Sequence, residues 1–254
     1  FVNKKVFIFD LDGTIYIGND PIDDVSNLIS ELQENGHTIK FLSNNSSKDK
    51  NEYVQKLKSH NIYIRDSQII LSTDVVIKYL NENGYTSGYV IGTNSMLAYL
   101  RDKGIHHSLK NPEFVLLGYD TELTYTKIQK ASILIYSGLP YFATHEDKFC
   151  PTMEGPIPDA GSFIEMFETV TNRRPLVFGK PEKQMIEYLT DGKSNLDDYV
   201  FIGDRLHTDF AMAKLIGVDF VCVLTGETIR EDIETEGIWP SLIINSAADL
   251  LRLL

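Results

Sequence analysis

The stretch FIFDLDGTIY, residues 7–16, joins an apolar run to two carboxylates and a glycine. Residues 6–9 consist of valine, isoleucine and phenylalanine, a composition typical of a strand buried on both faces. Asp10 and Asp12 follow at once, and Gly13 permits a sharp turn directly after them. The stretch therefore predicts a buried strand that delivers two acidic groups at its carboxyl end.

Strand-like and helical segments alternate after this stretch. Apolar residues recur with helical spacing over 25–32, residues 38–42 form a strand-like run, and a second helical segment includes Tyr53 and Leu57. The alternation returns late in the chain, in the segments PLVFGKP, YVFIGD and DFVCVLTG with helical stretches between them. This pattern indicates an α/β fold with a Rossmann-like, doubly wound parallel sheet and helices on both faces.

A second α/β stretch interrupts the alternation between residues 81 and 174. It contains the strand-like segments GYVIG, EFVLLGY and YFATH and two helical segments, but no comparable set of acids at strand ends. We therefore expect a catalytic core made of residues 1–80 and 175–254. Residues 81–174 are expected to form an inserted α/β cap domain that covers the site.

The composition restricts the class of partner. The chain has 254 residues, 43% of them apolar, and a net charge of −12. Nucleic-acid binders depend on clustered Lys and Arg, so this charge favours a small-molecule partner over nucleic acid. Cys150 and Cys222 have no C-x-x-C spacing, no apolar run is long enough to span a membrane, and no signal-peptide pattern is present. These features predict a cytoplasmic protein without a membrane partner.

Polar side chains stand at the ends of four predicted strands. In open α/β sheets, ligands bind beyond the carboxyl ends of the strands, so these side chains are expected to converge. Each group alone is a weak signal, but four groups of complementary charge in one chain favour a single site. They are Asp10 with Asp12, Ser43 with Asn44, Lys180, and Asp204.

The acidic groups suit phosphoryl transfer assisted by a metal ion. Mg²⁺ prefers oxygen ligands, which Asp10, Asp204 and a backbone carbonyl can supply. The ion would reduce the repulsion between a phosphate and an attacking carboxylate, so that Asp10 can act as the nucleophile and form an aspartyl-phosphate. Asp12 can protonate the leaving oxygen and later accept a proton from water, while Thr14 supports the turn.

The remaining groups suit binding of the phosphoryl oxygens. The Ser43 hydroxyl, N–H groups around Asn44 and the Lys180 ammonium are all hydrogen-bond donors. Donors fixed in place around the transferred group are the main requirement of phosphoryl transfer. The sequence therefore predicts a Mg²⁺-dependent phosphatase that acts on small phosphomonoesters.

Four motifs, in this order and spacing, resemble those of the haloacid dehalogenase superfamily of phosphatases. They are DLDGT at 10–14, FLSNNSS at 41–47, FGKP at 178–181 and GDRLHTDF at 203–210. The insertion between the second and third motifs, with GYDTELTY, ATHEDKFCP and DAGS, resembles the NagD-like or p-nitrophenylphosphatase branch and its C2-type cap. The resemblance spans nearly the whole chain.

The resemblance implies a role for each matching residue. Asp10 is expected to be the nucleophile, Asp12 the acid and base, and Asp204 a Mg²⁺ ligand together with Asp10 and the Asp12 carbonyl. Relatives with this cap often dimerise through it, which suggests a homodimer. The resemblance further implies phosphate or substrate contacts for Ser43, Asn44, Asn45 and Lys180, supporting roles for Thr14 and Asp209, and a substrate loop in the cap that includes His145, Asp147 and Cys150.

Other interpretations share parts of this pattern. Asp209 can simply cap the following helix, and His145 and Cys150 can be packing residues. A receiver-type signalling domain also phosphorylates an aspartate, but it is shorter and lacks an acid at the position of Asp12. A dehalogenase has no use for that proton donor or for the acidic metal site. A phosphate-binding protein with weak or no catalysis on the same fold is the remaining alternative.

Overall fold

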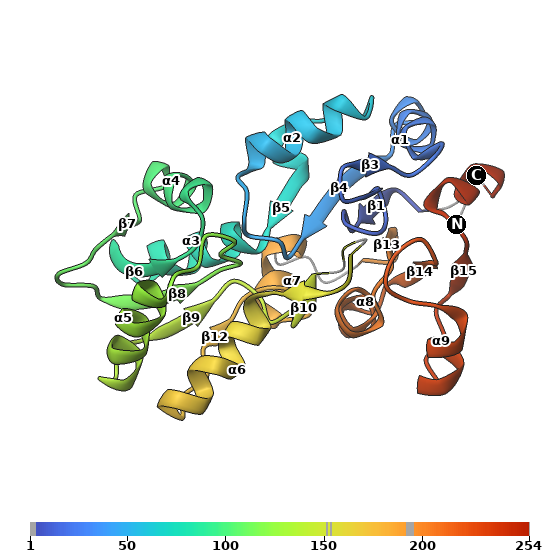
Figure 1. Ribbon diagram of the computed structural model, residues 1–254. Helices are drawn as coiled ribbons and strands as arrows, with labels where there is room; N and C mark the ends of the chain where they lie inside the picture. The colour runs from blue at the N-terminus through green and yellow to red at the C-terminus, as the bar shows by residue number, and fades with distance from the viewer. Residues whose placement is uncertain (1–3, 151, 153, 192–195, 254) are drawn as a thin grey trace. The chain divides into compact units, whose positions relative to one another are not determined.

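The structure, a computed structural model, describes residues 4–150, 152, 154–191 and 196–253 (Figure 1). The chain divides into two compact units. The first comprises Phe1–Ser43, Lys50–Ile70 and Ile186–Leu254, and the second comprises Asn44–Asp49 and Leu71–Met185. The predicted insertion, 81–174, lies wholly inside the second unit, which extends beyond it at both ends and also takes in the segment that follows Ser43.

The sheet of the first unit has six strands in the order β15-β14-β13-β1-β4-β5. Neighbouring strands from β15 to β4 pair in parallel, as expected for the predicted doubly wound sheet. Chain order reverses between β1 and β13, which makes their carboxyl ends the topological switch point of this sheet. The strands are β1 (Val6–Phe9), β4 (Thr38–Ser43), β5 (Ile69–Leu71), β13 (Tyr199–Gly203), β14 (Asp219–Val223) and β15 (Leu242–Ile244).

The predicted helices of the core are present. Helix α1 (Val25–Glu34) buries Val25, Leu28, Ile29 and Leu32, the apolar positions that predicted it. Tyr53 and Leu57 are the buried residues of α2 (Lys50–Ser59). The other elements are the hairpin β2 (Tyr16–Ile17) and β3 (Asp20–Pro21), the short helices η1 (Asp66–Gln68) and η3 (Ala247–Arg252), the π-helical turn η2 (Leu206–Phe210), and α7 (Lys183–Thr190), α8 (Ala211–Ile216) and α9 (Arg230–Glu236).

The second unit contains a parallel sheet of its own, with strand order β12-β9-β8-β6-β7. Chain order reverses between β6 and β8, so this sheet has its own switch point. A hairpin of β10 (Phe149–Cys150) and β11 (Ile157–Pro158) accompanies the sheet. The five strands are β6 (Ser87–Ile91), β7 (His106–His107), β8 (Phe114–Leu117), β9 (Tyr141–Ala143) and β12 (Leu176–Val177).

The strand before Lys180 does not belong to the sheet in which the sequence pattern places it. Strand β12 pairs in parallel with β9 of the second unit, with Leu176 opposite Phe142. Only two residues of PLVFGKP are extended, and an apolar pair of this kind suits the edge of either sheet. The pattern identified the strand correctly and assigned it to the wrong sheet.

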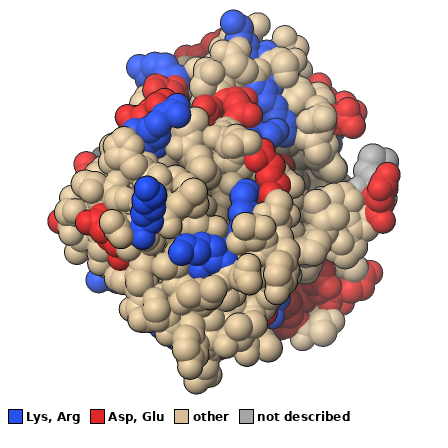
Figure 2. All heavy atoms as spheres, turned by 60° about the vertical axis from the view of Figure 1, so that its left-hand side comes forward, with Lys and Arg blue, Asp and Glu red and all other residues tan. Residues whose placement is uncertain are grey.

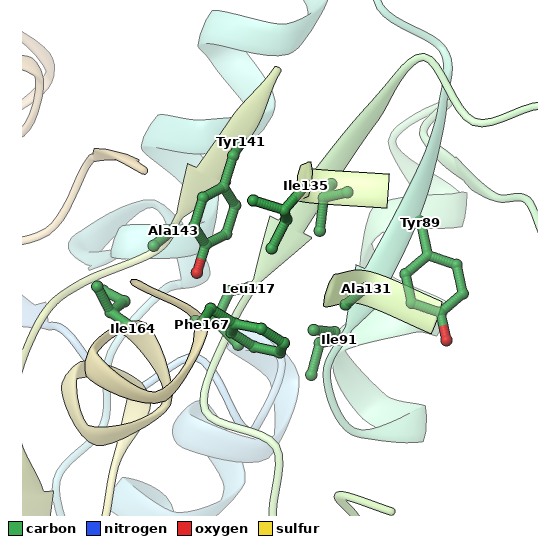
Figure 3. Packing of buried hydrophobic residues seen from close by; sticks show 10 residues of the cluster. Tyr89, Ile91, Leu117, Ala131, Ile135, Tyr141, Ala143, Ile164 and Phe167 are labelled. Atoms are coloured by element: carbon green, nitrogen blue, oxygen red, sulfur yellow. The ribbon is translucent and has the colours of Figure 1, made fainter. Parts of the chain in front are cut away.

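Helices cover both faces of the second sheet. Helices α5 (Tyr125–Tyr136) and α6 (Ala160–Thr171) pack on one face, where Figure 3 shows Ile135 and Phe167 turned toward Tyr141 and Leu117. Helix α3 (Ser72–Glu82) packs on the other face, where the Tyr79 ring lies 5.6 Å from the ring of Phe142. Tyr141 and Phe142, which are adjacent in β9, therefore contact helices on opposite faces of the sheet. Helix α4 (Asn94–Asp102) connects β6 to β7.

Charged residues of both signs are interspersed on the face shown in Figure 2, among a larger area of other residues. The net charge of −12 therefore does not make this face uniformly acidic. Within the described ranges, none of the helices combines the length and apolar character needed to cross a membrane.

Candidate active site

Asp10 and Asp204 lie at the switch point of the first sheet. Asp10 directly follows β1, Asp204 directly follows β13, and these strands are hydrogen-bonded neighbours. The Asp10 N–H continues the ladder by donating to the Ile202 carbonyl at 2.8 Å. The sheet order thus brings together two acids that are almost two hundred residues apart in the chain, as the strand-end argument predicts.

Asp209 completes a cluster of three buried carboxylates. One carboxylate oxygen from each of Asp10, Asp204 and Asp209 lies within 4.8 Å of the others. Burial raises the pKa of Asp204 well above its usual value, and the negative charges of Asp10 and Asp209 raise it further. The cluster therefore concentrates negative charge in a site with little access to water.

The chain holds Asp204 with groups from two loops. Asp204 Oδ2 accepts a hydrogen bond from the Glu227 N–H at 2.7 Å, and Asp204 Oδ1 accepts a longer one from the Thr14 hydroxyl at 3.4 Å. The Thr225 hydroxyl donates to the Gly13 carbonyl at 2.5 Å and so joins the two loops. The loop after β14 was missed by the sequence analysis, although LTGE follows a strand just as the other polar groups do.

Asp209 lies in the π-helical turn η2 and is completely buried. Its Oδ2 accepts a hydrogen bond from the Arg205 N–H at 3.2 Å, so it also braces the backbone next to Asp204. The Arg205 side chain pairs with Glu227, with 3.1 Å between Nε and Oε2. Asp209 therefore both contributes to the acidic cluster and organises the fourth motif.

The donor set fits a divalent cation with a preference for oxygen. All three members of the cluster are carboxylates, without a histidine or cysteine that would favour a softer metal. Burial and then the charges of Asp10 and Asp209 raise the pKa of Asp204, and a bound cation would offset this repulsion between the carboxylates. Asp10, Asp204 and Asp209 are therefore side chains of the first unit that can hold such an ion.

Asp12 lies in the turn that follows Asp10. The Gly13 N–H donates to the Tyr16 carbonyl at 2.8 Å, and Gly13 has a φ of +88°, which glycine adopts readily. The Asp12 charge raises the pKa values of Tyr16 and Tyr53, after the larger effect of burial on each. The Asp12 carboxylate is not one of the three clustered carboxylates, and its charge, like that of Asp10, acts on two buried phenols.

Ser43 is buried at the end of β4 and has a neighbour that the sequence analysis did not single out. Tyr53 of α2 is hydrogen-bonded to Ser43, an interaction that lowers the Tyr53 pKa but does not offset the effect of burial. The phenol therefore stays protonated. The pattern assigned Tyr53 to the buried face of a helix, and nothing in its spacing distinguished a site residue from a core residue.

Asn44 and Lys180 form a second buried group, within the second unit. The Asn44 side chain accepts from the Lys180 N–H at 2.7 Å and donates to the Lys180 carbonyl at 3.2 Å. It also donates to Asp147 Oδ1 at 3.0 Å. The Asn44 side chain thus contacts the backbone of the predicted phosphate-binding lysine. Asn45 instead accepts from the N–H and hydroxyl of Ser47, at 3.0 and 2.7 Å.

The residues predicted to form a substrate loop in the cap have different environments. His145 is completely buried and hydrogen-bonds through Nε2 to Asp159 Oδ1 at 2.9 Å. Asp147 contacts Asn44, as described above. Cys150 is half-buried in β10. Their roles in substrate binding stay predictions.

Family models match both ends of the chain, and relatives match nearly its whole length. The haloacid dehalogenase-like hydrolase model matches residues 7–106, and the HAD-hydrolase-like model matches residues 177–250. An acid sugar phosphatase of Staphylococcus haemolyticus is 30% identical over 94% of this chain and 92% of its own length. A 5′-nucleotidase of Bacillus subtilis is 27% identical over 96% of each chain.

A solved structure shows the same fold over nearly the whole chain. The 4-nitrophenylphosphatase of Thermotoga maritima superposes with a TM-score of 0.92 at 32% identity, covering 98% of this chain and 97% of its own. The match includes both units. The resemblance inferred from the four motifs and the insertion therefore agrees with comparisons over full length.

Proposed function

The chain belongs to the haloacid dehalogenase-like hydrolases, in their NagD and p-nitrophenylphosphatase branch, and on that premise we propose that it hydrolyses small phosphomonoesters with Mg²⁺ through an aspartyl-phosphate. It is a phosphoric monoester hydrolase. The observation that carries the proposal is the cluster of Asp10, Asp204 and Asp209 at the switch point of the first sheet. A bound Mg²⁺ would supply positive charge opposite the phosphoryl oxygens.

The first step forms a covalent bond to Asp10. One Asp10 carboxylate oxygen attacks phosphorus, and the bond between phosphorus and the ester oxygen breaks. Asp12 gives its proton to the departing oxygen, so that the alcohol leaves neutral. Asp12 is suited to this task because it is only half-buried and is not one of the three carboxylates that lie within 4.8 Å of one another.

The second step releases phosphate. A water molecule attacks the phosphorus of the aspartyl-phosphate while Asp12, now ionised, accepts one of its protons. The bond between phosphorus and Asp10 breaks, which regenerates both carboxyl groups in their starting states. We further propose that Ser43 and Lys180 contact the phosphoryl oxygens, because a hydroxyl and an ammonium group stabilise negative charge there.

The substrates proposed are small phosphorylated metabolites. Relatives bear the names acid sugar phosphatase, 4-nitrophenylphosphatase and 5′-nucleotidase. Sugar phosphates and nucleoside monophosphates are therefore the two classes to test first. We also propose that residues 81–174 act as a cap, that the protein forms a homodimer through them and that it is cytoplasmic. Sedimentation tests the homodimer, and cell fractionation tests the location.

Substitution of the two acids of the first motif tests the mechanism. With 4-nitrophenyl phosphate and Mg²⁺, Asp10→Asn is expected to abolish turnover and to form no covalent phosphoenzyme. Asp12→Asn is expected to slow turnover strongly while phosphoenzyme still forms from this good leaving group, as detected by mass spectrometry after acid quenching.

A folded Asp10→Asn variant with near wild-type turnover would overturn the mechanism. Tight binding of inorganic phosphate by the wild-type protein without any turnover of sugar, nucleotide or nitrophenyl esters would instead identify a phosphate-binding protein. Chelation with EDTA is expected to stop hydrolysis, and addition of Mg²⁺ to restore it.

A further inference from the structure

The switch point of the second sheet holds a segment of this chain. In doubly wound sheets, the crevice beyond the carboxyl ends of the strands at the switch point is where ligands bind. Here residues 44–47, which we call the 44–47 loop, are hydrogen-bonded to the residues that follow β6 and β8. The Thr93 hydroxyl, beyond β6, donates to the Ser47 carbonyl at 2.6 Å, and the Tyr119 N–H, beyond β8, donates to Ser46 Oγ at 2.8 Å.

The Ser46 side chain is held by hydrogen bonds to residues that follow β8 and β9. It is completely buried, and its hydroxyl bonds both to the Tyr119 N–H and to Thr144 Oγ1, the latter at 3.0 Å. A Cβ atom added to Gly118 would stand only 2.9 Å from Ser46 Oγ. The hydroxyl therefore fits against backbone, and its removal would leave buried partners without a hydrogen bond.

A hydrogen-bonded chain continues from Ser46 into helix α6. Thr144 Oγ1 lies 2.8 Å from His145 Nδ1, and His145 Nε2 lies 2.9 Å from Asp159 Oδ1. Asp159 caps α6 by accepting from the Ala160 N–H at 2.5 Å. Thr144 and His145 are completely buried. Ser46 is thus held by a fixed polar network that ends on a helix of the second unit.

The other end of the loop holds the backbone of Lys180. Asn44, two residues before Ser46, bonds to both the N–H and the carbonyl of Lys180, and its own carbonyl accepts from the Ser72 hydroxyl at 2.7 Å. Gly179 leaves no space beside this arrangement, because a Cβ there would stand 2.7 Å from Asn44 Oδ1 and 2.6 Å from His145 Cβ. The loop and the residues around Lys180 therefore pack as one body.

We propose that Ser46 is a positioning residue for Lys180, acting by fastening the 44–47 loop in the switch-point crevice of the second sheet so that Asn44 holds the Lys180 backbone in one geometry. The importance of that geometry for catalysis rests on the proposed function, in which Lys180 contacts the phosphoryl group. The positioning of the Lys180 backbone by Ser46 does not depend on the proposed function. Ser46 contacts neither substrate nor metal in this proposal.

Ser46→Ala and Ser47→Ala form a matched pair to test this role. The Ser47 hydroxyl bonds to Asn45 Oδ1 within the loop, and the Thr93 contact uses the Ser47 carbonyl, so Ser47→Ala keeps the loop fastened. In Ser46→Ala, peptides that include Lys180 are expected to exchange amide hydrogen for deuterium several-fold faster. In Ser47→Ala they are expected to exchange at the wild-type rate.

Kinetics with 4-nitrophenyl phosphate separate positioning from general stability. Well below the melting temperature, Ser46→Ala is expected to lose roughly tenfold in kcat and to bind inorganic phosphate, the competing product, several-fold more weakly. Ser47→Ala is expected to stay within about twofold of wild type on both measures. A purely structural Ser46 would lower the melting temperature and leave the inhibition constant for phosphate unchanged.

Unchanged exchange around Lys180 in a folded Ser46→Ala variant would overturn the positioning role. If that variant fails to fold, Thr144→Val, which keeps the Tyr119 contact and removes the link to His145, is expected to change both measures in the same direction to a smaller extent. An effect on exchange in a protein whose wild-type form hydrolyses no phosphomonoester would sustain the positioning role and refute the proposed function.

Discussion

Gly226 lies so close to the Asp204 carboxylate that a Cβ atom at position 226 would overlap Asp204 Oδ2. Gly13 approaches the same carboxylate, where a Cβ would stand 2.5 Å from Oδ2. Backbone from two loops therefore closes around this side chain. Any substituent at either position must displace the carboxylate or the loop, because a Cβ cannot rotate away.

Gly226→Ala is therefore expected to damage the acidic cluster while leaving the fold intact. Moving the Asp204 carboxylate by even about 1 Å would cost roughly 100-fold in kcat/KM and weaken Mg²⁺ activation. Steady-state kinetics over a range of Mg²⁺ concentrations measure both effects. Gly217→Ala is the control, because Gly217 has a φ of +71° and open space around it. That control should lose about 1 kcal/mol of stability and no activity.

Asp204→Asn is expected to make the metal-free protein more stable and inactive. The substitution removes, at nearly constant volume, a carboxylate whose pKa is raised by burial and by the charges of Asp10 and Asp209. Thermal unfolding in EDTA should show a higher melting temperature for the variant than for wild type. Addition of Mg²⁺ should raise the melting temperature of wild type only, because binding to the folded state stabilises it. A variant with a lower melting temperature than wild type in EDTA would contradict this account of the cluster.

The same cluster sets the pH dependence of the metal-free protein. The pKa of Asp204 is raised in the folded state, so the folded protein binds a proton that the unfolded chain releases at the same pH. The loss of stability caused by Asp204 is therefore greatest above its raised pKa in the folded state. It disappears as pH falls through that pKa toward about 4, the pKa of aspartate in the unfolded chain. In urea titrations with EDTA, the stability difference between Asp204→Asn and wild type should shrink as pH falls from about 8 to about 5. A stability difference that grows as pH falls over this range would contradict the prediction.

Much of the fold and part of the acidic site could be predicted from sequence because strand-end position carries topological information. Asp10 and Asp204 each follow an apolar run, and the neighbouring places of β1 and β13 in the sheet bring them together. Helical spacing likewise identified α1, whose four predicted apolar residues are all buried. In these cases the local pattern and the tertiary environment agree.

Other features depend on contacts that leave no periodic signal. The two extended residues of β12 suit either sheet, and only pairing with Phe142 settles which sheet contains them. Ser46 looks like an ordinary turn residue in SNNSS, yet its burial depends on Tyr119 and Thr144, both remote in the chain. A single sequence reports what a residue is capable of bonding, and the fold determines which partner it meets.

The two cysteines are expected to differ strongly in reactivity. Burial, together with the charges of Asp204 and Asp209, raises the pKa of the Cys222 thiol to about 12. At about pH 8 only about one Cys222 in 10,000 would be a thiolate, so native protein should react with a thiol reagent at Cys150 alone. Both should react in denaturant. Rapid labelling of a native Cys150→Ser variant would show that Cys222 is less protected than its surroundings indicate.

Tyr53 offers a test of whether the residue beside Ser43 contributes to catalysis. Burial and the Asp12 charge keep the phenol protonated, and the phenol hydroxyl is hydrogen-bonded to the Ser43 side chain. Tyr53→Phe removes that one hydroxyl, keeps the ring that packs α2, and should lower kcat/KM for 4-nitrophenyl phosphate by about tenfold, the equivalent of one lost hydrogen bond. Tyr63→Phe, at a side chain that is 64% exposed, is the matched control and should have no effect. Equal activities for the two variants would mean that the phenol serves the core alone, because only Tyr53→Phe removes a hydroxyl that is hydrogen-bonded to Ser43.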